Sequence, residues 1–314
     1  MKAIEVTGLE KHYGDFRALD GLNLEVESGI VFGFLGPNGA GKTTTIRILT
    51  GLAHASAGSA KVAGVDVGKG DGQLARNIGY LPEEPAFYPW MTPIEFLDHV
   101  ARIFGSTTSE RRARTQELLE LVGLAEAGKR RIGGFSRGMR QRLGLAQALV
   151  NHPEVIFLDE PVSALDPVGR RDVLELIARL KGEATVFMST HILADVERVC
   201  DRIGVINHGK LVTAARREEL MEQYVLPIFE IEGIPGTELA IQAWQEKLTK
   251  FSWFESGNTS DHTARILVKD LEAARFDLLE SVRQAGLAID RFEVVRPSLE
   301  DVFLKLVEEK EDQR

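Results

Sequence analysis

The sequence predicts an α/β protein, with a core that has a parallel sheet, an antiparallel β layer and a helical subdomain, and a small α+β domain after it. Two apolar runs, 155–158 and 185–189, have the length and composition of strands that are buried on both faces. Helical patterns follow these runs at 169–181 and 192–200. This alternation indicates parallel strands with crossover helices, and it favours a ligand site at the carboxyl ends of the strands.

The elements before these strands also have distinct patterns. Residues 4–7 and 22–26 alternate apolar and polar side chains, which predicts a half-solvated antiparallel layer. The apolar run 30–35 predicts a third buried strand, and residues 44–49 open a helix. From residue 86 to about 150 the pattern is different, because helical segments rich in Arg and Glu follow two prolines. We expect a helical insertion there.

The pattern changes again after Leu220, and we expect two domains, 1–220 and 221–314. The first is the nucleotide-binding domain, as the motifs below indicate, and the second is a small α+β accessory domain. The expected strands of the second domain are 227–234, 264–268 and 288–294, and its expected helices are 238–248, 271–284 and 298–308.

Composition narrows the classes of partner. The 314 residues carry a formal net charge of −9, and an acidic chain is poorly suited to neutralising phosphates, so we expect no nucleic acid partner. The single cysteine, Cys200, allows no disulfide within the chain and fits a reducing cytosol. The sequence has no apolar stretch of membrane-spanning length and no pattern of a signal peptide. We therefore expect a cytoplasmic protein that reaches a membrane only through a partner.

A glycine-rich loop lies between the strand at 30–35 and the helix at 44–49. It has the spacing G-x-x-x-x-G-K-T, in which the glycines let backbone N–H groups surround phosphate oxygens. The lysine adds a charge for the outer phosphates, and the threonine hydroxyl can bind Mg²⁺. The alternative, a chance glycine-rich turn, does not account for the flanking strand and helix. The predicted nucleotide-binding residues are Gly36, Pro37, Asn38, Gly39, Ala40, Gly41, Lys42, Thr43 and Thr44.

A phosphate loop alone is compatible with kinases, GTPases, motors and transport ATPases. Two adjacent carboxylates, Asp159 and Glu160, end the apolar run at 155–158. Burying two such groups costs free energy unless a cation is present. We expect Asp159 to hold Mg²⁺ through water, and Glu160 to orient or deprotonate the attacking water.

A serine and a glycine stand directly before a helical pattern, near residue 136, where they can bind an anion or simply cap the helix. Set between the phosphate loop and the acidic strand, this segment resembles the signature motif of ABC ATPases. Most of the first 220 residues follow that family's order of motifs. The resemblance implies that the segment closes over ATP bound by a second subunit. Its residues are Ser136, Arg137, Gly138, Met139, Arg140 and Gln141.

The resemblance implies further roles by position. Residues 36–44 resemble Walker A, and residues 155–160 resemble Walker B with Glu160 as the catalytic base. Tyr13 stands where the family stacks an aromatic ring on adenine, and His191 matches the switch histidine that contacts the γ-phosphate. The D-loop, which communicates between two paired subunits, corresponds to Ser163, Ala164, Leu165 and Asp166.

Two positions depart from the family pattern. Glu83 stands where the family usually has glutamine. A carboxylate can still bind Mg²⁺, but its extra charge near the γ-phosphate can alter hydrolysis and coupling. Arg137 replaces the first glycine of the signature, while Ser136 and Gly138 are retained. We expect both substitutions to affect the rate of hydrolysis rather than the class of protein.

The resemblance implies an ATP-hydrolysing subunit, with ATP and Mg²⁺ as cofactors, that powers export through a separate polytopic membrane subunit. One Walker A and one signature imply a second ABC ATPase subunit, either another copy or a paralogue. The segment 87–104, with Trp90 and Met91, is where the membrane subunit would dock. Residues 296–304 resemble the end of the appended domain of bacterial export ATPases. The implied location is peripheral, on the inner face of the cell membrane.

Two alternatives belong to other classes. A soluble ABC ATPase that acts on the ribosome or a DNA repair complex would usually carry two nucleotide domains or a long coiled coil. A P-loop kinase or GTPase would need an acceptor site or a guanine-specificity site. It would have no use for residues 136–141 or for His191.

Overall fold

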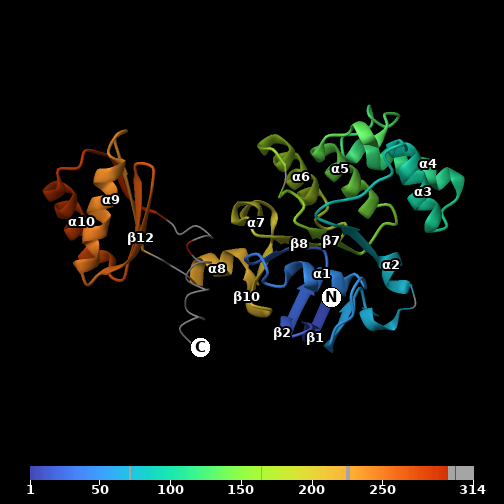
Figure 1. Cartoon of the computed structure of the whole chain (residues 1–314), viewed down its shortest axis with the longest axis horizontal. Coiled ribbons are helices and arrows are strands. Elements are labelled where there is room, and N and C mark those ends of the chain that lie inside the picture. Colours follow the sequence, from blue (N-terminus) through green and yellow to red (C-terminus); the bar gives the residue numbers. More distant parts are fainter. Residues whose placement is uncertain (71, 164, 224–226, 296–300, 302–314) are drawn as a thin grey trace. The chain divides into compact units, whose positions relative to one another are not determined.

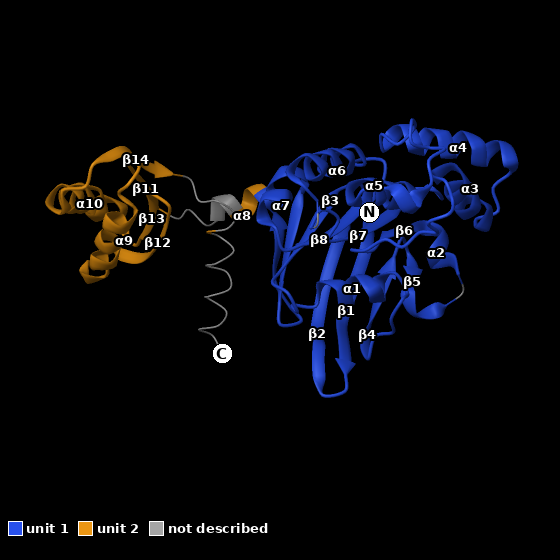
Figure 2. Ribbon diagram, turned by 45° about the horizontal axis from the view of Figure 1, so that its top comes forward, with its two compact units in different colours: residues 1–217 blue, residues 218–314 orange. Residues whose placement is uncertain are grey.

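The chain forms two compact units, Met1–Arg217 and Glu218–Arg314, which Figure 2 shows in different colours. The division falls close to the expected boundary at residue 220. The computed structural model describes residues 1–70, 72–163, 165–223, 227–295 and 301.

The first unit is built on a six-stranded sheet in the order β10-β9-β3-β8-β7-β6. All neighbouring strands in it are parallel except β10, which is antiparallel to β9. The strands are β3 (Val31–Leu35), β6 (Ile78–Leu81), β7 (Val155–Asp159), β8 (Thr185–Thr190), β9 (Arg202–Asn207) and β10 (Lys210–Arg216). Every residue of β3, β7 and β8 is buried, which is why these strands are continuous apolar runs in the sequence.

A second, four-stranded sheet lies in the same unit in the order β2-β1-β4-β5 (Figure 2) and is antiparallel throughout. The strands are β1 (Lys2–Tyr13), β2 (Phe16–Glu27), β4 (Ala57–Val62) and β5 (Val65–Asp66). From Leu22 to Glu27, buried and exposed residues alternate, so one face of β2 packs on the core and the other meets solvent. Apolar side chains from both sheets form one core, which includes Phe32, Phe34 and Leu24. The predicted antiparallel layer is confirmed.

Helices connect the strands and also form a subdomain of their own, where α3, α4 and α5 gather in Figure 1. Helices α3 and α4 begin at Thr92 and Thr107, each with a reciprocal capping box to a glutamate. The helices are α1 (Lys42–Leu49), α2 (Gln73–Asn77), α3 (Pro93–Ile103), α4 (Thr108–Leu121), α5 (Arg137–Ala148), α6 (Pro167–Arg179), α7 (Leu193–Val199) and α8 (Arg217–Gln223). The helical insertion expected between residue 86 and about 150 is present.

Helix α5 packs directly on the segment that follows β6. A Cβ at Gly144 would lie 2.6 Å from Leu81 Cδ1 and 3.2 Å from Pro85 Cβ. Contacts this close require glycine unless the neighbouring side chains move. The packing therefore places the N-terminal half of α5 beside Glu83 and Glu84.

The second unit is an antiparallel sheet in the order β12-β13-β11-β14, packed against two helices. Its elements are β11 (Ile228–Gly233), α9 (Glu238–Glu246), β12 (Phe254–Ser260), β13 (Thr263–Val268), α10 (Leu271–Ala285) and β14 (Ile289–Val295). Phe229, Trp244 and Leu278 belong to its own hydrophobic core. This is the α+β arrangement expected from the sequence.

Some elements differ from the sequence prediction or fall outside the description. Strand β12 is missing from the prediction because its residues are mostly polar and pair only with β13 at the edge of the sheet. The prediction also lacks β4, β5, β9 and β10. The expected helix 298–308, and the segment 296–304 that resembles the appended domain of exporters, lie outside the described residues except for Asp301.

Candidate nucleotide-binding site

Three neighbouring parallel strands carry the candidate site at their carboxyl ends. Strand β8 lies between β3 and β7, and Asp159 of β7 pairs with Ser189 of β8. The phosphate loop follows β3, Glu160 follows β7, and His191 follows β8. Motifs that are far apart in the sequence therefore meet at one edge of the sheet, as the parallel topology requires.

The backbone of the phosphate loop approaches its surroundings too closely to carry side chains at two positions. A Cβ at Gly36 would lie 2.3 Å from Ile206 O, and one at Gly41 would lie 2.8 Å from Ala18 O. Gly41 also has a φ of 110°, a left-handed conformation that glycine adopts without strain. The loop leads directly into α1, whose N-terminal N–H groups favour an anion. The geometry thus fits a phosphate cradle.

Lys42 is held against the inside of this loop. Its ammonium donates hydrogen bonds to Gly36 O at 2.7 Å and to Pro37 O at 3.2 Å. Only 5% of the residue is exposed. Glu160 Oε1 lies 3.5 Å from Nζ. The lysine is therefore a buried cation that is already aimed at the loop, where it can offset the charge of the outer phosphates.

Asp159 is buried at the end of β7 and accepts two hydrogen bonds from hydroxyl groups. Ser189 Oγ donates to Asp159 Oδ1 at 2.6 Å, and Thr43 Oγ1 donates to the same oxygen at 3.2 Å. Burial raises the pKa of the Asp159 carboxyl, and these two hydrogen bonds only partly oppose that effect. A bound cation would favour the charged form. The hydroxyl of Thr43 and the carboxylate of Asp159 are hard oxygen donors, which suit Mg²⁺.

Glu160 lies directly after Asp159, in a backbone conformation with a φ of 47°. Its N–H donates to Ser189 O at 3.2 Å and to Ser189 Oγ at 3.1 Å, which anchors this unusual conformation to β8. Glu160 Oε2 lies 2.9 Å from His191 Nδ1. The carboxylate therefore contacts the phosphate-loop lysine with one oxygen and the histidine with the other.

A cavity opens over the phosphate loop and collects residues from several motifs. Glu83 lines it together with Lys42 and Thr43 of the loop. Gly36, Pro37 and Ala40 belong to the loop but do not line the cavity. The lining residues are Phe16, Ala18, Asn38, Gly39, Gly41, Lys42, Thr43, Thr44, Glu83, Glu160 and His191.

An aromatic ring at the cavity comes from Phe16, while Tyr13, the predicted adenine-stacking residue, does not line it. Phe16 is exposed and lines the cavity. Tyr13 pairs with Phe16 across the β1–β2 hairpin, and its ring lies 4.9 Å from the Lys11 ammonium. Only the hairpin register brings Phe16 to this place, so a search for an aromatic by motif position overlooks it. Ser189 was likewise overlooked, although a serine at the end of a buried strand is itself a signal.

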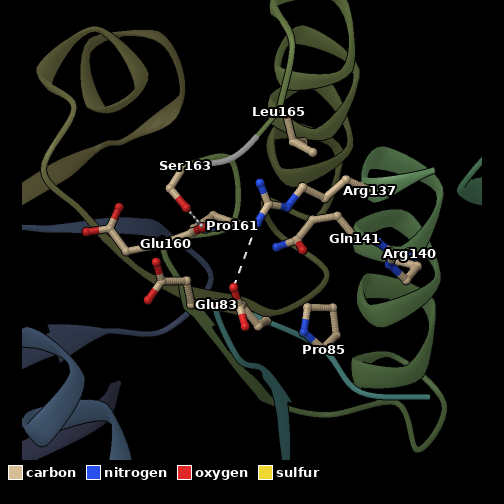
Figure 3. A pocket seen from close by; sticks show the side chains of 10 residues that line it. Glu83, Pro85, Arg137, Arg140, Gln141, Glu160, Pro161, Ser163 and Leu165 are labelled. Atoms are coloured by element: carbon tan, nitrogen blue, oxygen red, sulfur yellow. Dashed lines mark hydrogen bonds and ion pairs between the residues drawn. The ribbon is translucent and has the colours of Figure 1, made fainter.

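A second hollow lies beside the first, between α5 and the segments that follow β6 and β7 (Figure 3). Glu83 and Glu160 line both hollows. Arg137 Nη2 lies 3.7 Å from Glu84 Oε1. The residue that replaces the first glycine of the signature thus contacts Glu84, which directly follows the glutamate that stands in place of the usual glutamine. The full lining is Glu83, Glu84, Pro85, Arg137, Arg140, Gln141, Glu160, Pro161, Ser163 and Leu165.

The signature segment forms the start of α5. Ser136 caps the helix, and its Oγ accepts a hydrogen bond from the Met139 N–H at 3.2 Å. Gly138 has space around it, because a Cβ there would meet Leu165 Cδ2 at 3.9 Å and nothing closer. Arg140 donates to Phe135 O at 3.1 Å. None of these residues lines the cavity of the phosphate loop within this chain.

The predicted D-loop connects Glu160 to α6. Ser163 Oγ donates to Glu160 O at 3.3 Å. Leu165 lines the second hollow, and Asp166 is the N-cap residue of α6. Ala164 lies outside the described residues.

Comparisons with known proteins agree with this geometry. A family model described as "ABC transporter" matches residues 19–163, and one described as "ATP-binding protein DrrA1-3-like, C-terminal domain" matches residues 216–307. The uncharacterized ABC transporter ATP-binding protein YxlF of Bacillus subtilis (strain 168) is 40% identical over 97% of this chain and 99% of its own length. The daunorubicin resistance ATP-binding protein DrrA3 of Streptomyces coeruleorubidus is 36% identical over 97% of this chain and 95% of its own.

A solved structure has the same fold in the first unit. It is the dimeric structure of a post-hydrolysis state of the ATP-binding cassette MJ0796 bound to ADP and Pi. It matches with a TM-score of 0.61 and 25% identity, over 68% of this chain and 98% of that one.

The first unit is therefore a P-loop ATP-binding cassette. The chain belongs to the ATP-binding proteins of ABC transporters, and it carries a DrrA1-3-like C-terminal domain. Among the described residues, no helix combines the length and apolar composition that crossing a bilayer requires.

Proposed function

We propose that this protein hydrolyses ATP and thereby powers export through a separate membrane-spanning subunit. The observation that carries this proposal is the placement of Lys42, Asp159, Glu160 and His191 around one phosphate loop. A protein that only bound nucleotide would need the loop and the lysine. It would not need a carboxylate beside a histidine at the mouth of the cavity.

Each side chain has a role in this mechanism. Thr43 and Asp159 would hold Mg²⁺, which supplies charge neutralisation for the β- and γ-phosphates when bound. Glu160 accepts a proton from, or orients, the attacking water. His191 stands 2.9 Å from Glu160, where it can fix the carboxylate and reach the γ-phosphate. Lys42 neutralises the phosphates from inside the loop.

A second ATPase subunit completes the site in this proposal. The signature residues Ser136 and Gly138 do not line the cavity of the phosphate loop in the same chain, which supports a role toward nucleotide held by a partner. The related cassette MJ0796 was solved as a dimer bound to ADP and Pi. Arg137 would then lie between Glu84 of the same chain, with which it forms an ion pair, and the nucleotide that the second subunit binds.

The helical insertion offers a surface for a membrane subunit. Tyr88 and Trp90 are 48% and 65% exposed, and their ring centroids are 5.3 Å apart. Exposed aromatic side chains that lie together are typical of interaction sites. This supports docking at the insertion, and with it a peripheral location on the inner face of the membrane. Export as the direction is supported by the DrrA-like C-terminal domain.

The experiment compares phosphate release by the wild-type protein and by Glu160→Gln, with Mg²⁺ and ATP. The variant should bind ATP but lose at least about a hundredfold in turnover, because it lacks the general base, and it should accumulate as an ATP-bound dimer in gel filtration. The matched control is Glu154→Gln at the opposite, exposed end of β7, which should hydrolyse ATP normally. Normal turnover by Glu160→Gln would refute the proposed role.

A second experiment addresses the membrane partner. Trp90→Ala should leave the ATPase activity of the isolated subunit unchanged but reduce its co-purification with the membrane protein encoded beside it. Leu52→Ala, which removes an exposed apolar side chain outside the insertion, is the control. Recovery of a ribosomal or DNA repair complex with the wild-type protein instead would favour the soluble alternative.

A further inference from the structure

A buried ion pair joins the two helices that follow the catalytic loops. Arg170 Nε donates a hydrogen bond to Asp195 Oδ1 at 2.6 Å. Asp195 is 1% exposed, whereas the Arg170 side chain is 31% exposed. The second oxygen, Asp195 Oδ2, is buried and has no hydrogen-bond partner among the described residues. Arg170 is therefore the cation that offsets the burial of this charge.

The position of the pair connects it to the site. Arg170 lies in the first turn of α6, where its N–H donates to Asp166 O of the D-loop. Asp195 lies in the first turn of α7, where its N–H donates to Ile192 O, and α7 directly follows His191. Helices α6 and α7 pack on each other (Figure 1). The pair thus ties the loop after Glu160 to the loop that carries the histidine.

His191 needs such support, because little else fixes it. Its side chain is 44% exposed, so packing does not determine its position. The backbone beside it is held where the Ile192 N–H donates to Thr190 Oγ1 at 3.0 Å, and where Asp195 anchors α7. A shift of α7 would move the histidine away from Glu160.

Burying a carboxylate is costly, and breaking its ion pair leaves an uncompensated charge. Burial raises the pKa of Asp195, the hydrogen bond and charge of Arg170 lower it, and the nearby charges of Glu160 and His191 raise and lower it, respectively. An apolar pair of similar volume would often be at least as stable as a buried ion pair. The short hydrogen bond between Arg170 and Asp195 therefore points to a role in positioning the two loops rather than in stability alone.

We propose that Arg170 and Asp195 are a positioning pair that holds His191 against Glu160 and couples its position to the D-loop. The inference rests on the proposed ATPase function. Neither residue touches the reacting atoms, so the pair acts through the two helices. Movement of the D-loop on contact with a second subunit would pass through Arg170 to Asp195, and so to the histidine.

The chain contains a matched control. Arg198 of α7 and Glu175 of α6 form a second ion pair between the same two helices, at 3.2 Å, with both side chains about half exposed. This pair also joins α6 to α7, but its members lie farther along both helices from the loops. If any ion pair between α6 and α7 were enough to position His191, breaking either pair would have the same effect on ATP hydrolysis.

The experiment measures steady-state ATP hydrolysis by the full chain for Asp195→Asn, Arg170→Gln, the double variant and Glu175→Gln. We expect each of the first two to lower kcat at least tenfold, while KM for ATP stays within about twofold because the phosphate loop is untouched. The double variant should lose no more than the worse single variant, since both changes break one coupling. Glu175→Gln should keep kcat within about twofold.

A second readout does not depend on turnover. The ¹⁵N chemical shifts of the His191 ring, assigned by their loss in His191→Gln, report its hydrogen bond to Glu160. We expect them to change in Asp195→Asn and Arg170→Gln, but not in Glu175→Gln. Unchanged shifts together with normal kcat in the folded variants would overturn the proposal, as would additive losses in the double variant.

The two readouts also separate this inference from the proposed function. A wild-type chain that does not hydrolyse ATP would refute the ATPase assignment, while the ring shifts would still test the pair. Should Asp195→Asn fail to fold, the partly exposed Arg170→Gln gives the same test.

Discussion

Lys42 and Glu160 form a buried contact at the phosphate loop, with Nζ and Oε1 3.5 Å apart and side chains only 5% and 9% exposed. The lysine comes from the start of α1 and the glutamate from the turn after β7. The carboxylate of Glu160 thus neutralises part of the lysine charge that faces the phosphate loop. This contact links the lysine of the phosphate loop to the residue that we propose as the general base.

Removal of the lysine tests this relationship. Lys42→Ala should weaken ATP binding by about ten- to a hundredfold, because it removes a charge-assisted contact and leaves the Gly36 and Pro37 carbonyls without this donor. Isothermal titration calorimetry measures the affinity. The control is Lys69→Ala at an exposed position. An unchanged affinity in Lys42→Ala would contradict the phosphate cradle.

Glu83 lines the cavity of the phosphate loop, whereas Glu84 lines only the neighbouring hollow. Glu83→Gln should therefore tighten ATP binding by about two- to tenfold, because it removes a negative charge that faces the triphosphate. Glu84→Gln, which breaks the ion pair with Arg137, should alter affinity less. Equal affinity and equal turnover in Glu83→Gln and the wild type would make Glu83 a passive substitute for the usual glutamine.

At neutral pH and without nucleotide, the buried charge of Asp159 should make the protein less stable than a variant with a neutral side chain at this position. Burial raises the pKa of its carboxyl in the folded state above the unfolded value. Between these two pKa values, the folded state binds more protons than the unfolded state does. The protonated Asp159 carboxyl therefore favours folding below the pKa of the unfolded state, and this contribution to stability is lost as pH rises through the pKa of the folded state. Asp159→Asn should consequently raise Tm by a few degrees at pH 7 without Mg²⁺, as measured by calorimetry.

The pH series separates this effect from a general gain in stability. The difference in Tm between Asp159→Asn and the wild type should shrink as pH falls, because the raised pKa lets the folded wild type take up a proton before the unfolded chain does. Addition of Mg²⁺ and ATP should stabilise the wild type but not the variant. Asp201→Asn, which weakens a surface ion pair with Lys181, should show no gain in Tm. A lower Tm for Asp159→Asn at pH 7 would refute the prediction.

Cys200 should be inert in the folded protein. It is 3% exposed and packs so closely on β3 that a Cβ at Gly33 would lie 2.8 Å from its Sγ. Burial raises the pKa of its thiol, which suppresses the reactive thiolate. Maleimide labelling followed by mass spectrometry should detect modification only in denaturant. Lys69→Cys, at the surface, supplies a thiol that should react rapidly in the folded state.

Much of this architecture could be predicted because the signals are local. The strands β3, β7 and β8 are continuous apolar runs since both of their faces are buried. Strand β12 carries no such run and was missed. The phosphate loop could be recognised from spacing alone, because the close approach of Gly36 and Gly41 to neighbouring backbone excludes other residues there.

The order of the motifs, the two-domain organisation and the chemical groups available to a nucleotide can be read from the sequence alone. Which of these groups meet depends on tertiary packing. It brings Phe16 to the cavity, joins Thr43 to Asp159 across 116 positions of sequence, and pairs Arg170 with Asp195. Strand register and helix packing set these contacts, and both depend on burial across the whole unit rather than on any local pattern.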